Sequence, residues 1–185
     1  MKKKTTLHLA GAGMRRKNFY VVAVDVYKVG LGLSSDIMGR AVEWAKSDGQ
    51  KGSLSPYILK ANTANTVRAV VLLKFVRSVT NAQFIEAFRE SFNDCNPASF
   101  QAFETFMKAS FGSSGLNVDD EVGFYWLTDG QLVITMNGKN FGSIAIAEVC
   151  ERLLDVYVDP KRAVSPELLQ SIEKNVASVK ASLKA

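Results

Sequence analysis

The order of apolar and polar residues predicts three β-strands in the first half of the chain. Thr5 to Ala10 is short and rich in residues that favour strands. Tyr20 to Leu33 is rich in Val and Tyr, with Gly30 and Gly32 marking a bend or bulge inside it. Thr66 to Val76 is an apolar run long enough for a central strand that is buried on both faces over much of its length.

A helix and a long loop are expected between the second and third of these strands. Ser34 and Ser35 offer N-caps for a helix that runs through Ala45. The stretch Ser47 to Thr63 is rich in Gly, Ser, Lys and Asn, which is typical of a loop within one domain.

Two phenylalanine-rich helices are predicted after the third strand. Thr80-x-x-Gln83 has the pattern of a capping box, and Asn96-Pro97 is an N-cap followed by proline at the first helical position. Apolar residues then recur at helical spacing, and Gly112 to Gly115 ends the second helix. These apolar positions are Phe84, Ile85, Phe88 and Phe92 in the first helix and Phe100, Phe103, Met107 and Phe111 in the second.

A meander of three short strands follows. Asp129-Gly130 and Asn137-Gly138 both suit type I′ hairpin turns, in which the two central residues have positive φ. The strands that these turns join are expected at Glu121 to Leu127, Leu132 to Met136 and Asn140 to Ser143.

The chain is expected to end in two helices, the second starting at Ser165-Pro166. Their apolar stripes are Ile146, Val149, Cys150, Leu153 and Leu154 in one and Leu169, Ile172, Val176, Val179 and Leu183 in the other. The element order is therefore β, β, α, β, α, α, β, β, β, α, α. Strands joined by tight turns are typical of an antiparallel sheet, so we predict an α+β fold with helices layered on one face.

Length and composition favour one globular domain over residues 1–185, of which 47% are hydrophobic. The net charge is +5, with basic clusters at Lys2 to Lys4 and Arg15 to Lys17. A solvated surface explains this charge, and so would binding of a membrane surface or nucleic acid, although no nucleic-acid-binding motif accompanies it. The start of the chain is a poor secretion signal, so we expect a cytoplasmic location, or a plastid-type organelle after removal of a transit peptide. No apolar run is long enough to span a bilayer.

Several classes of chemistry lack the residues that they need. A single histidine, His8, excludes a site with two imidazoles, and Cys95 and Cys150 cannot form a disulfide framework, so we expect no metal. Gly11-Ala12-Gly13 is no dinucleotide fingerprint, because Arg16 stands where the third glycine belongs, and we expect no cofactor. Asp25, inside an apolar strand, is either a buried functional carboxylate or a residue on the wet face or edge of the sheet.

The combination of motifs along nearly the whole chain resembles the chalcone isomerase superfamily. That family has a Gly-x-Gly-x-Arg turn, then a strand of the form V-Y-x-V-G-L, and further blocks in the same order as here. The matching blocks are Gly11 to Lys17, Val26 to Leu31, Arg77-Ser78-Val79, Phe88 to Phe92, Asn137-Gly138-Lys139 with Phe141 to Ile144, and Val164-Ser165-Pro166.

This resemblance implies an open-faced β-sandwich with a ligand cleft between the sheet and the helices. The enzymes of the family close a chalcone to a flavanone, and their relatives without catalytic activity bind fatty acids. Arg15 matches the family's arginine, which assists cyclisation in the enzymes and holds the carboxylate in the fatty-acid binders. Tyr27 stands where the enzymes have threonine, and it resembles the tyrosine that grips the carboxylate beside that arginine.

The other family positions depart from the enzyme pattern or match it loosely. Phe84 replaces the enzymes' tyrosine, Ser91 lies near their asparagine, and Ser165 matches the Ser or Thr of the last block. Lys74 is the nearest counterpart of their lysine, and Phe88 joins Phe84 as an expected pocket residue. The ordinary alternatives are a solvated arginine at position 15, phenylalanines that only form core, and Ser165 acting only as an N-cap.

These residues favour a monomeric protein without catalytic activity that binds a fatty acid or similar amphipathic carboxylate. An arginine forks onto a carboxylate in two hydrogen bonds, while an acyl tail gains about 0.8 kcal/mol for each methylene that it buries. The alternative is a weak chalcone isomerase with Arg15 as its catalytic residue and a flavonoid-like ligand. A third reading is an interaction protein whose basic N-terminus meets a membrane or nucleic acid.

Overall fold

A computed structural model describes residues 5–47 and 52–182, with side chains described up to residue 178. In this part of the chain six strands form one antiparallel sheet in the order β1-β2-β3-β4-β5-β6, so every strand pairs with its neighbour in sequence. The strands are β1 (Leu7–Phe19), β2 (Val22–Ser34), β3 (Val67–Phe75), β4 (Glu121–Leu127), β5 (Leu132–Met136) and β6 (Lys139–Ile144).

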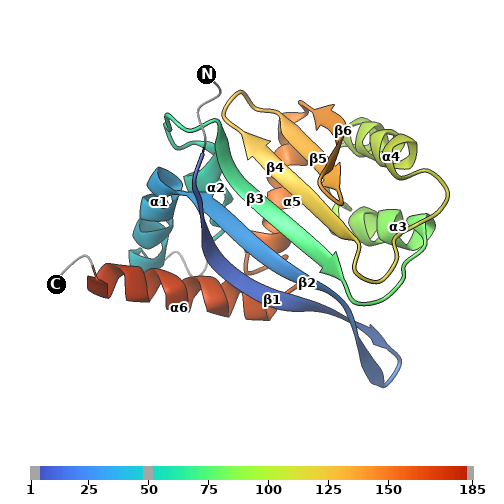
Figure 1. The fold of residues 1–185 in the computed structure, drawn as a ribbon, viewed down its shortest axis with the longest axis horizontal. Coiled ribbons are helices and arrows are strands. Elements are labelled where there is room, and N and C mark those ends of the chain that lie inside the picture. Colours follow the sequence, from blue (N-terminus) through green and yellow to red (C-terminus); the bar gives the residue numbers. More distant parts are fainter. Residues whose placement is uncertain (1–4, 48–51, 183–185) are drawn as a thin grey trace.

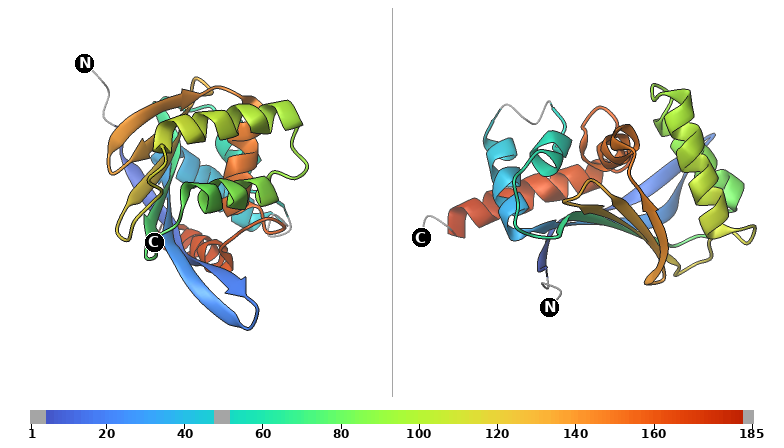
Figure 2. Two further views of the ribbon diagram at one scale, coloured as in Figure 1. Left: turned by 90° about the vertical axis from the view of Figure 1, so that its right-hand side faces the viewer. Right: turned by 90° about the horizontal axis from the view of Figure 1, so that it is seen from above.

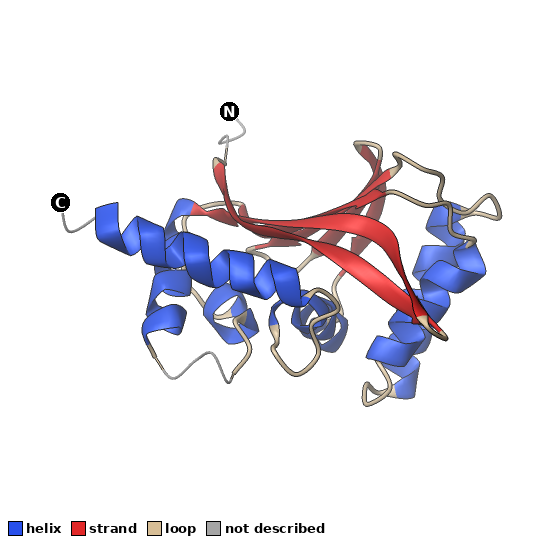
Figure 3. Ribbon diagram, turned by 90° about the horizontal axis from the view of Figure 1, so that it is seen from below, coloured by secondary structure: helices blue, strands red, loops and turns tan. Residues whose placement is uncertain are grey.

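The helices lie on one side of the sheet and leave its other face open, as Figure 3 shows. The helices α3 and α4 cover the opposite end of the sheet from α1 and α2, with α5 between them and α6 along β1 (Figures 1 and 2). Their bounds are α1 (Ser35–Lys46), α2 (Ser55–Leu59), α3 (Asn81–Ser91), α4 (Pro97–Phe111), α5 (Ala147–Val158) and α6 (Pro166–Ser182). The predicted α+β fold is confirmed.

The core fills the space between the sheet and these helices because the strands β2 to β5 present alternate apolar residues to the same side. In β3, Ala69, Val71, Leu73 and Phe75 are almost completely buried, while Lys74 is exposed. The helix α5 crosses behind the middle strands, and Tyr157 on it is fully buried.

The two helix caps read from the sequence are confirmed. Thr80 accepts a hydrogen bond from Gln83 N, and the Gln83 side chain accepts one from Thr80 N, which completes the capping box of α3. Asn96 accepts a hydrogen bond from Ala98 N at 2.9 Å and precedes Pro97 at the start of α4. Ser34 is the N-cap of α1 as expected, although its side chain makes no capping hydrogen bond.

The first strand is far longer than predicted. The motif Gly11 to Arg15 lies inside β1 and is not a turn. Its glycines are needed because α6 packs directly on this strand: a Cβ at Gly11 would lie 2.6 Å from Ile172 Cγ1, and one at Gly13 would lie 2.5 Å from Leu168 N. The extended conformation of this segment therefore depends on its packing against α6, which the spacing of apolar residues along the sequence does not reveal.

Three smaller predictions are also corrected. The expected loop from Ser47 to Thr63 contains the short helix α2, and residues 48–51 of it lie outside the described residues. Asn137 and Gly138 both have positive φ, but at the other turn only Gly130 does, so Asp129-Gly130 is not type I′. A register shift of the β1–β2 pair does lie at Gly32, but the extra residue is on β1, between Leu9 and Gly11, and a second shift lies between Arg15 and Arg16, away from Gly30.

Candidate functional site

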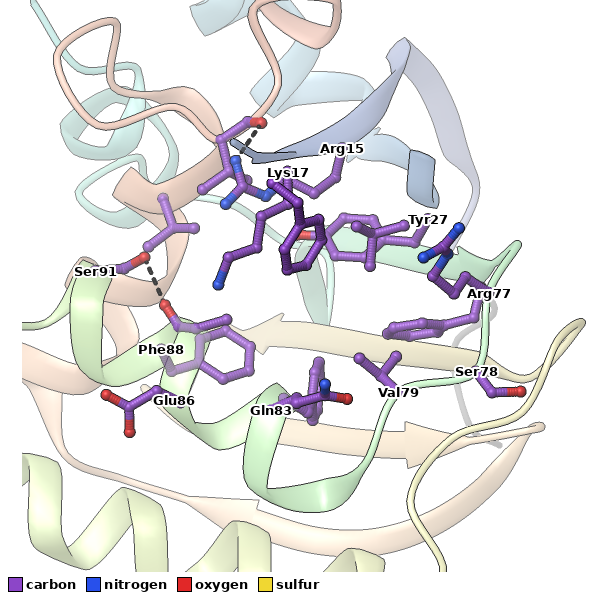
Figure 4. A pocket seen from close by; sticks show the side chains of 17 residues that line it. Arg15, Lys17, Tyr27, Arg77, Ser78, Val79, Gln83, Glu86, Phe88 and Ser91 are labelled. Carbon is purple, nitrogen blue, oxygen red and sulfur yellow. Dashed lines mark hydrogen bonds between the residues drawn. The ribbon is translucent and has the colours of Figure 1, made fainter. Parts of the chain in front are cut away.

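A cavity of about 270 Å³ opens where the base of the β1–β2 hairpin meets α3 (Figure 4). Strands β1, β2 and β3, the segment after β3, helix α3, Val156 and Val164 all contribute to its wall. The surface that faces the cavity is mainly apolar, although eight of the seventeen lining residues carry polar side chains.

Arg15 and Tyr27 occupy the β-sheet side of this cavity and come from adjacent strands. The two residues are Cα partners in the β1–β2 register, so their side chains leave the sheet on the same face. Arg15 Nη1 donates a hydrogen bond to the Val164 carbonyl oxygen at 3.3 Å, which orients the guanidinium at the edge of the cavity (Figure 4). The Tyr27 side chain is buried.

A second buried tyrosine lies behind Tyr27. Burial raises the pKa of Tyr27 to about 12, against the opposing effects of Arg15 and the Tyr157 hydroxyl. Burial also raises the pKa of Tyr157 well above its ordinary value, and the neighbouring Tyr27 adds to that rise. Both hydroxyls are therefore protonated donors at neutral pH. The Tyr157 hydroxyl interacts with Tyr27 but makes no hydrogen bond of normal geometry.

The floor of the cavity is aromatic. Tyr27, Phe75, Phe84 and Phe88 form a continuous chain, with successive ring centroids 5.3, 5.7 and 5.0 Å apart. Each ring meets its neighbour tilted or edge-on, which is the favourable arrangement for aromatic pairs. These rings belong to the hydrophobic core and also face the cavity, so the two readings of the phenylalanines in the sequence are compatible.

Three cations line the cavity, and two of them have no acidic partner in the described part of the chain. Neither Arg15 nor Arg77 forms an ion pair there, whereas Lys17 Nζ lies 3.8 Å from Glu90 Oε1 on α3. Glu86, the acid in the wall, pairs with Arg89. The site therefore presents two unpaired guanidinium groups, which favours an anionic ligand.

Most of the site residues proposed from the sequence come together here. Five of them line the cavity: Arg15, Tyr27, Phe84, Phe88 and Ser91. The Ser91 hydroxyl is already used, since it donates a hydrogen bond to the Ala87 carbonyl oxygen at 3.0 Å (Figure 4).

The structure does not bring Lys74 or Ser165 into this cavity. Lys74 is on the opposite face of β3 from Phe75 and is exposed. Its Nζ lies 3.5 Å from Asp119 Oδ1. Ser165 is fully buried at the start of α6, where its hydroxyl oxygen accepts a hydrogen bond from Leu168 N at 3.3 Å. An N-cap role thus accounts for Ser165.

Sequence reasoning missed three residues of the site. Lys17 lies two residues after Arg15 in β1 and therefore on the same face, a relationship hidden by the short predicted strand. Tyr157 lies beyond Leu154, where the apolar stripe of its helix was expected to stop. Arg77 follows β3 and was noted only as part of a family block.

The acidic residues, cysteines and helices outside the cavity show no arrangement for a metal ion or a membrane span among residues 5–47 and 52–182. No group of three or more His, Cys, Asp or Glu side chains there is placed to hold a metal ion, and none of the helices is long and apolar enough to cross a membrane. Cys95 and Cys150 are free and buried, and burial raises the pKa of each thiol to about 11. Asp25 is half-exposed and ion-paired with Arg16, so it is not a buried functional carboxylate.

Comparisons with known proteins agree with this architecture. A family model described as chalcone isomerase-like matches residues 2–168. The crystal structure of an Arabidopsis thaliana fatty-acid binding protein superposes with a TM-score of 0.76 and 18% sequence identity, over 94% of this chain and 89% of that one. No curated protein sequence matches the chain.

Proposed function

The chain belongs to the chalcone isomerase-like family, and we propose that it binds a fatty acid or similar amphipathic carboxylate in the cavity beside Arg15. The observation that carries this proposal is an unpaired guanidinium beside a buried tyrosine hydroxyl, at the edge of an apolar, aromatic cavity. A charged headgroup and an apolar tail are the two parts of a ligand that such a wall complements.

The headgroup would lie between Arg15 and Tyr27. A guanidinium donates two parallel hydrogen bonds to a carboxylate, and each charge-assisted bond contributes about 1.5–3 kcal/mol. The Tyr27 hydroxyl supplies a third donor, since its raised pKa keeps it protonated. The Tyr157 hydroxyl lies behind Tyr27 and interacts with it, so it would help to hold the Tyr27 hydroxyl in place for the headgroup.

The tail would supply most of the affinity. Each buried methylene contributes about 0.8 kcal/mol, so seven of them contribute on the order of 6 kcal/mol before the cost of immobilising the ligand. The chain of rings from Tyr27 to Phe88 is the surface against which these methylenes would lie. Arg15 then determines the orientation of the ligand, with the carboxylate at Arg15 and the tail along the aromatic rings.

The Arabidopsis protein supports this proposal through its name and shared fold, since it is described as a fatty-acid binding protein. Direct titration of purified protein with octanoate and decanoate, followed by calorimetry, tests it. We expect saturable binding at one site. Binding of the same strength to octanol and octanoate would contradict a carboxylate site, because octanol has the tail without the charge.

The alternative reaction, cyclisation of a chalcone, is tested with the same protein. Formation of flavanone above the spontaneous rate, and loss of that excess in Arg15→Gln, would support an enzyme. A progress curve that matches buffer would leave binding as the role of the cavity.

A further inference from the structure

The tip of the β1–β2 hairpin carries an apolar cluster that faces solvent. Phe19, Tyr20, Val21 and Val22 follow one another at the turn, and their exposed fractions are 49%, 104%, 96% and 58%. We define these four residues as the apolar tip. Turns of this kind normally carry Gly, Asn or Asp, so four apolar residues here contradict ordinary turn chemistry.

The backbone of the apolar tip is also unusual for these residue types. Tyr20 has a φ of 57°, a left-handed conformation that an aromatic residue adopts only at a cost. Glycine or asparagine would relieve that cost and remove the exposed ring. A sequence that keeps Tyr20 at this position breaks two local rules together, and such places are where functional surfaces are expected.

The hairpin also projects beyond the body of the protein. The register of β3 with β2 ends at Tyr27, and Val26 still accepts a hydrogen bond from Val76 N at 3.0 Å, so only residues 22–25 of β2 pair with β1 alone. Figure 1 shows this two-stranded end extending away from the sheet and from α3. The apolar tip can therefore contact an extended surface before the rest of the protein touches that surface.

The side chains next to the apolar tip are basic. Lys17 Nζ lies 6.0 Å from the centre of the Phe19 ring, and its acidic neighbour, Glu90 Oε1, is at 3.8 Å, a long and exposed ion pair that leaves the ammonium accessible to a headgroup. On the other side, Arg77 shares a shallow hollow with Val22 and Val24 and has no acidic partner in the described residues. The one acid in that hollow, Asp25, is neutralised by Arg16 at 2.8 Å.

We propose that the apolar tip inserts into the interface of an anionic lipid bilayer, with Lys17 and Arg77 against the headgroups. Tyrosine and aliphatic side chains beside cations are the combination that stabilises shallow insertion. A folded protein partner would have to bury about 800 Å² on this side, and a four-residue tip on a two-stranded ribbon offers far less.

The position of the cavity gives this insertion a consequence, which rests on the proposed function. Phe19 and Lys17 belong both to the tip region and to the wall of the cavity. A hairpin seated in a bilayer therefore places the cavity mouth at the membrane surface, where amphipathic carboxylates reside. The protein would take up or release its ligand there without passage of the acyl tail through water.

Sedimentation with vesicles tests the insertion separately from ligand binding. We expect the protein to bind vesicles of equal parts phosphatidylglycerol and phosphatidylcholine, and pure phosphatidylcholine vesicles more weakly. The double variant Tyr20→Asn and Val21→Ser keeps a residue that accepts left-handed φ at the turn, and we expect its vesicle affinity to fall about tenfold or more. Val118→Ser is the matched control, because Val118 is a half-exposed valine in the loop after α4.

A fluorescent label measures insertion directly. Both native cysteines are buried, so an environment-sensitive dye attached to Val21→Cys reports the tip alone. We expect the emission of this dye to shift to the blue with anionic vesicles. The emission of the same dye on Ala64→Cys should stay unchanged, because Ala64 precedes the start of β3, at the end of that strand opposite to the hairpin tip.

Three results would overturn the proposal. They are absence of vesicle binding, equal vesicle binding by the wild type and the double variant, and a concentration-dependent dimer without vesicles that the double variant abolishes. Octanoate titration of the double variant without vesicles distinguishes the two proposals, since its cavity should still bind ligand when the tip no longer inserts.

Discussion

Arg15 and Arg16 are neighbours in β1, but their side chains serve opposite faces of the sheet. Arg15 reaches the cavity and donates a hydrogen bond only to a backbone carbonyl. Arg16 points to solvent, where it pairs with Asp25 at 2.8 Å and also contacts the Glu167 carboxylate. Because successive side chains of a strand point to opposite faces, the Arg15 guanidinium is available to a ligand, while that of Arg16 is neutralised by Asp25 and Glu167.

This pair of residues makes a controlled test of the carboxylate site. We expect Arg15→Gln to weaken octanoate binding about 10- to 150-fold, which corresponds to the loss of one of the two charge-assisted bonds, about 1.5–3 kcal/mol, since the glutamine amide can still donate to the carboxylate. Arg16→Gln removes the same charge from the same strand and should leave the affinity unchanged. Calorimetric titration of both variants is the measurement, and equal losses would mean that net charge, not the geometry at Arg15, controls binding.

The partnerless hydroxyl of Tyr157 predicts a stabilising substitution. A buried polar group without a hydrogen bond costs about 1–3 kcal/mol, so Tyr157→Phe should make the ligand-free protein more stable by about 1–2 kcal/mol. The same variant should gain less thermal stability from added octanoate than the wild type, because it has lost a donor near the headgroup. Thermal melts with and without octanoate measure both effects. A variant less stable than the wild type without ligand would show that the hydroxyl is satisfied.

The pKa of Tyr27 predicts how binding depends on pH. Between pH 6 and pH 9 the tyrosine stays protonated and the ligand stays ionised, so octanoate affinity should be flat. Below about pH 4.5 the carboxylate is protonated and its bonds to Arg15 weaken. As pH approaches about 12, Tyr27 ionises and repels the ligand. A tenfold change in affinity between pH 6 and pH 9 would contradict this assignment.

The same shift also affects folding. Because burial raises the pKa of Tyr27 above its ordinary value of 10.0, protonated Tyr27 favours the folded state. This contribution is complete below pH 10 and is lost as pH rises through about 12. We expect Tyr27→Phe to flatten the fall in the free energy of unfolding over that range, measured by urea denaturation at several pH values.

The sequence predicted those parts of the fold that local patterns encode. The caps at Thr80 and Asn96 and the strands of the meander depend on neighbouring residues, and each was placed within one or two positions. The motif that carries Arg15 and Tyr27 lines the cavity, and the role of these two residues in binding stays a prediction. What it misjudged was the conformation of that motif, since glycines and basic residues have the composition of a turn.

The misjudged parts depend on contacts between distant segments. The last turn of α5 is buried on all sides, so it has no apolar stripe, and Asp155 interrupts the pattern just before Tyr157. That carboxylate is tolerated because the hydroxyls of Ser53 and Ser55, about one hundred residues away, donate hydrogen bonds to it at 2.6 and 2.5 Å. No local pattern reports such partners.

Gly13 provides a test of how tightly β1 packs against α6. A Cβ there would lie 2.5 Å from Leu168 N, a backbone atom that cannot move alone. We expect Gly13→Ala to lower the free energy of unfolding by about 1–3 kcal/mol and to weaken octanoate binding, because the shift displaces Arg15 two residues away. Gly39→Ala is the control, since Gly39 lies within α1 with nothing within 4 Å of the added Cβ. It should stabilise the protein by about 0.5–1 kcal/mol. Similar urea midpoints for the two variants would show that β1 and α6 are not tightly packed.

The size of the cavity predicts a limit on the acyl chain. A cavity of about 270 Å³ lies just below the range of about 300–1,000 Å³ that is typical of small-molecule sites, so we expect it to enclose a ligand of about the size of octanoate. From butanoate to octanoate, each added methylene should strengthen binding about fourfold, the equivalent of about 0.8 kcal/mol. Beyond about eight carbons the added methylenes leave the cavity along Phe19, so the gain for each should fall. Calorimetry over the series from four to fourteen carbons measures the break. A constant increment through fourteen carbons would require a longer channel than the one between β1 and α3, and would place the tail elsewhere.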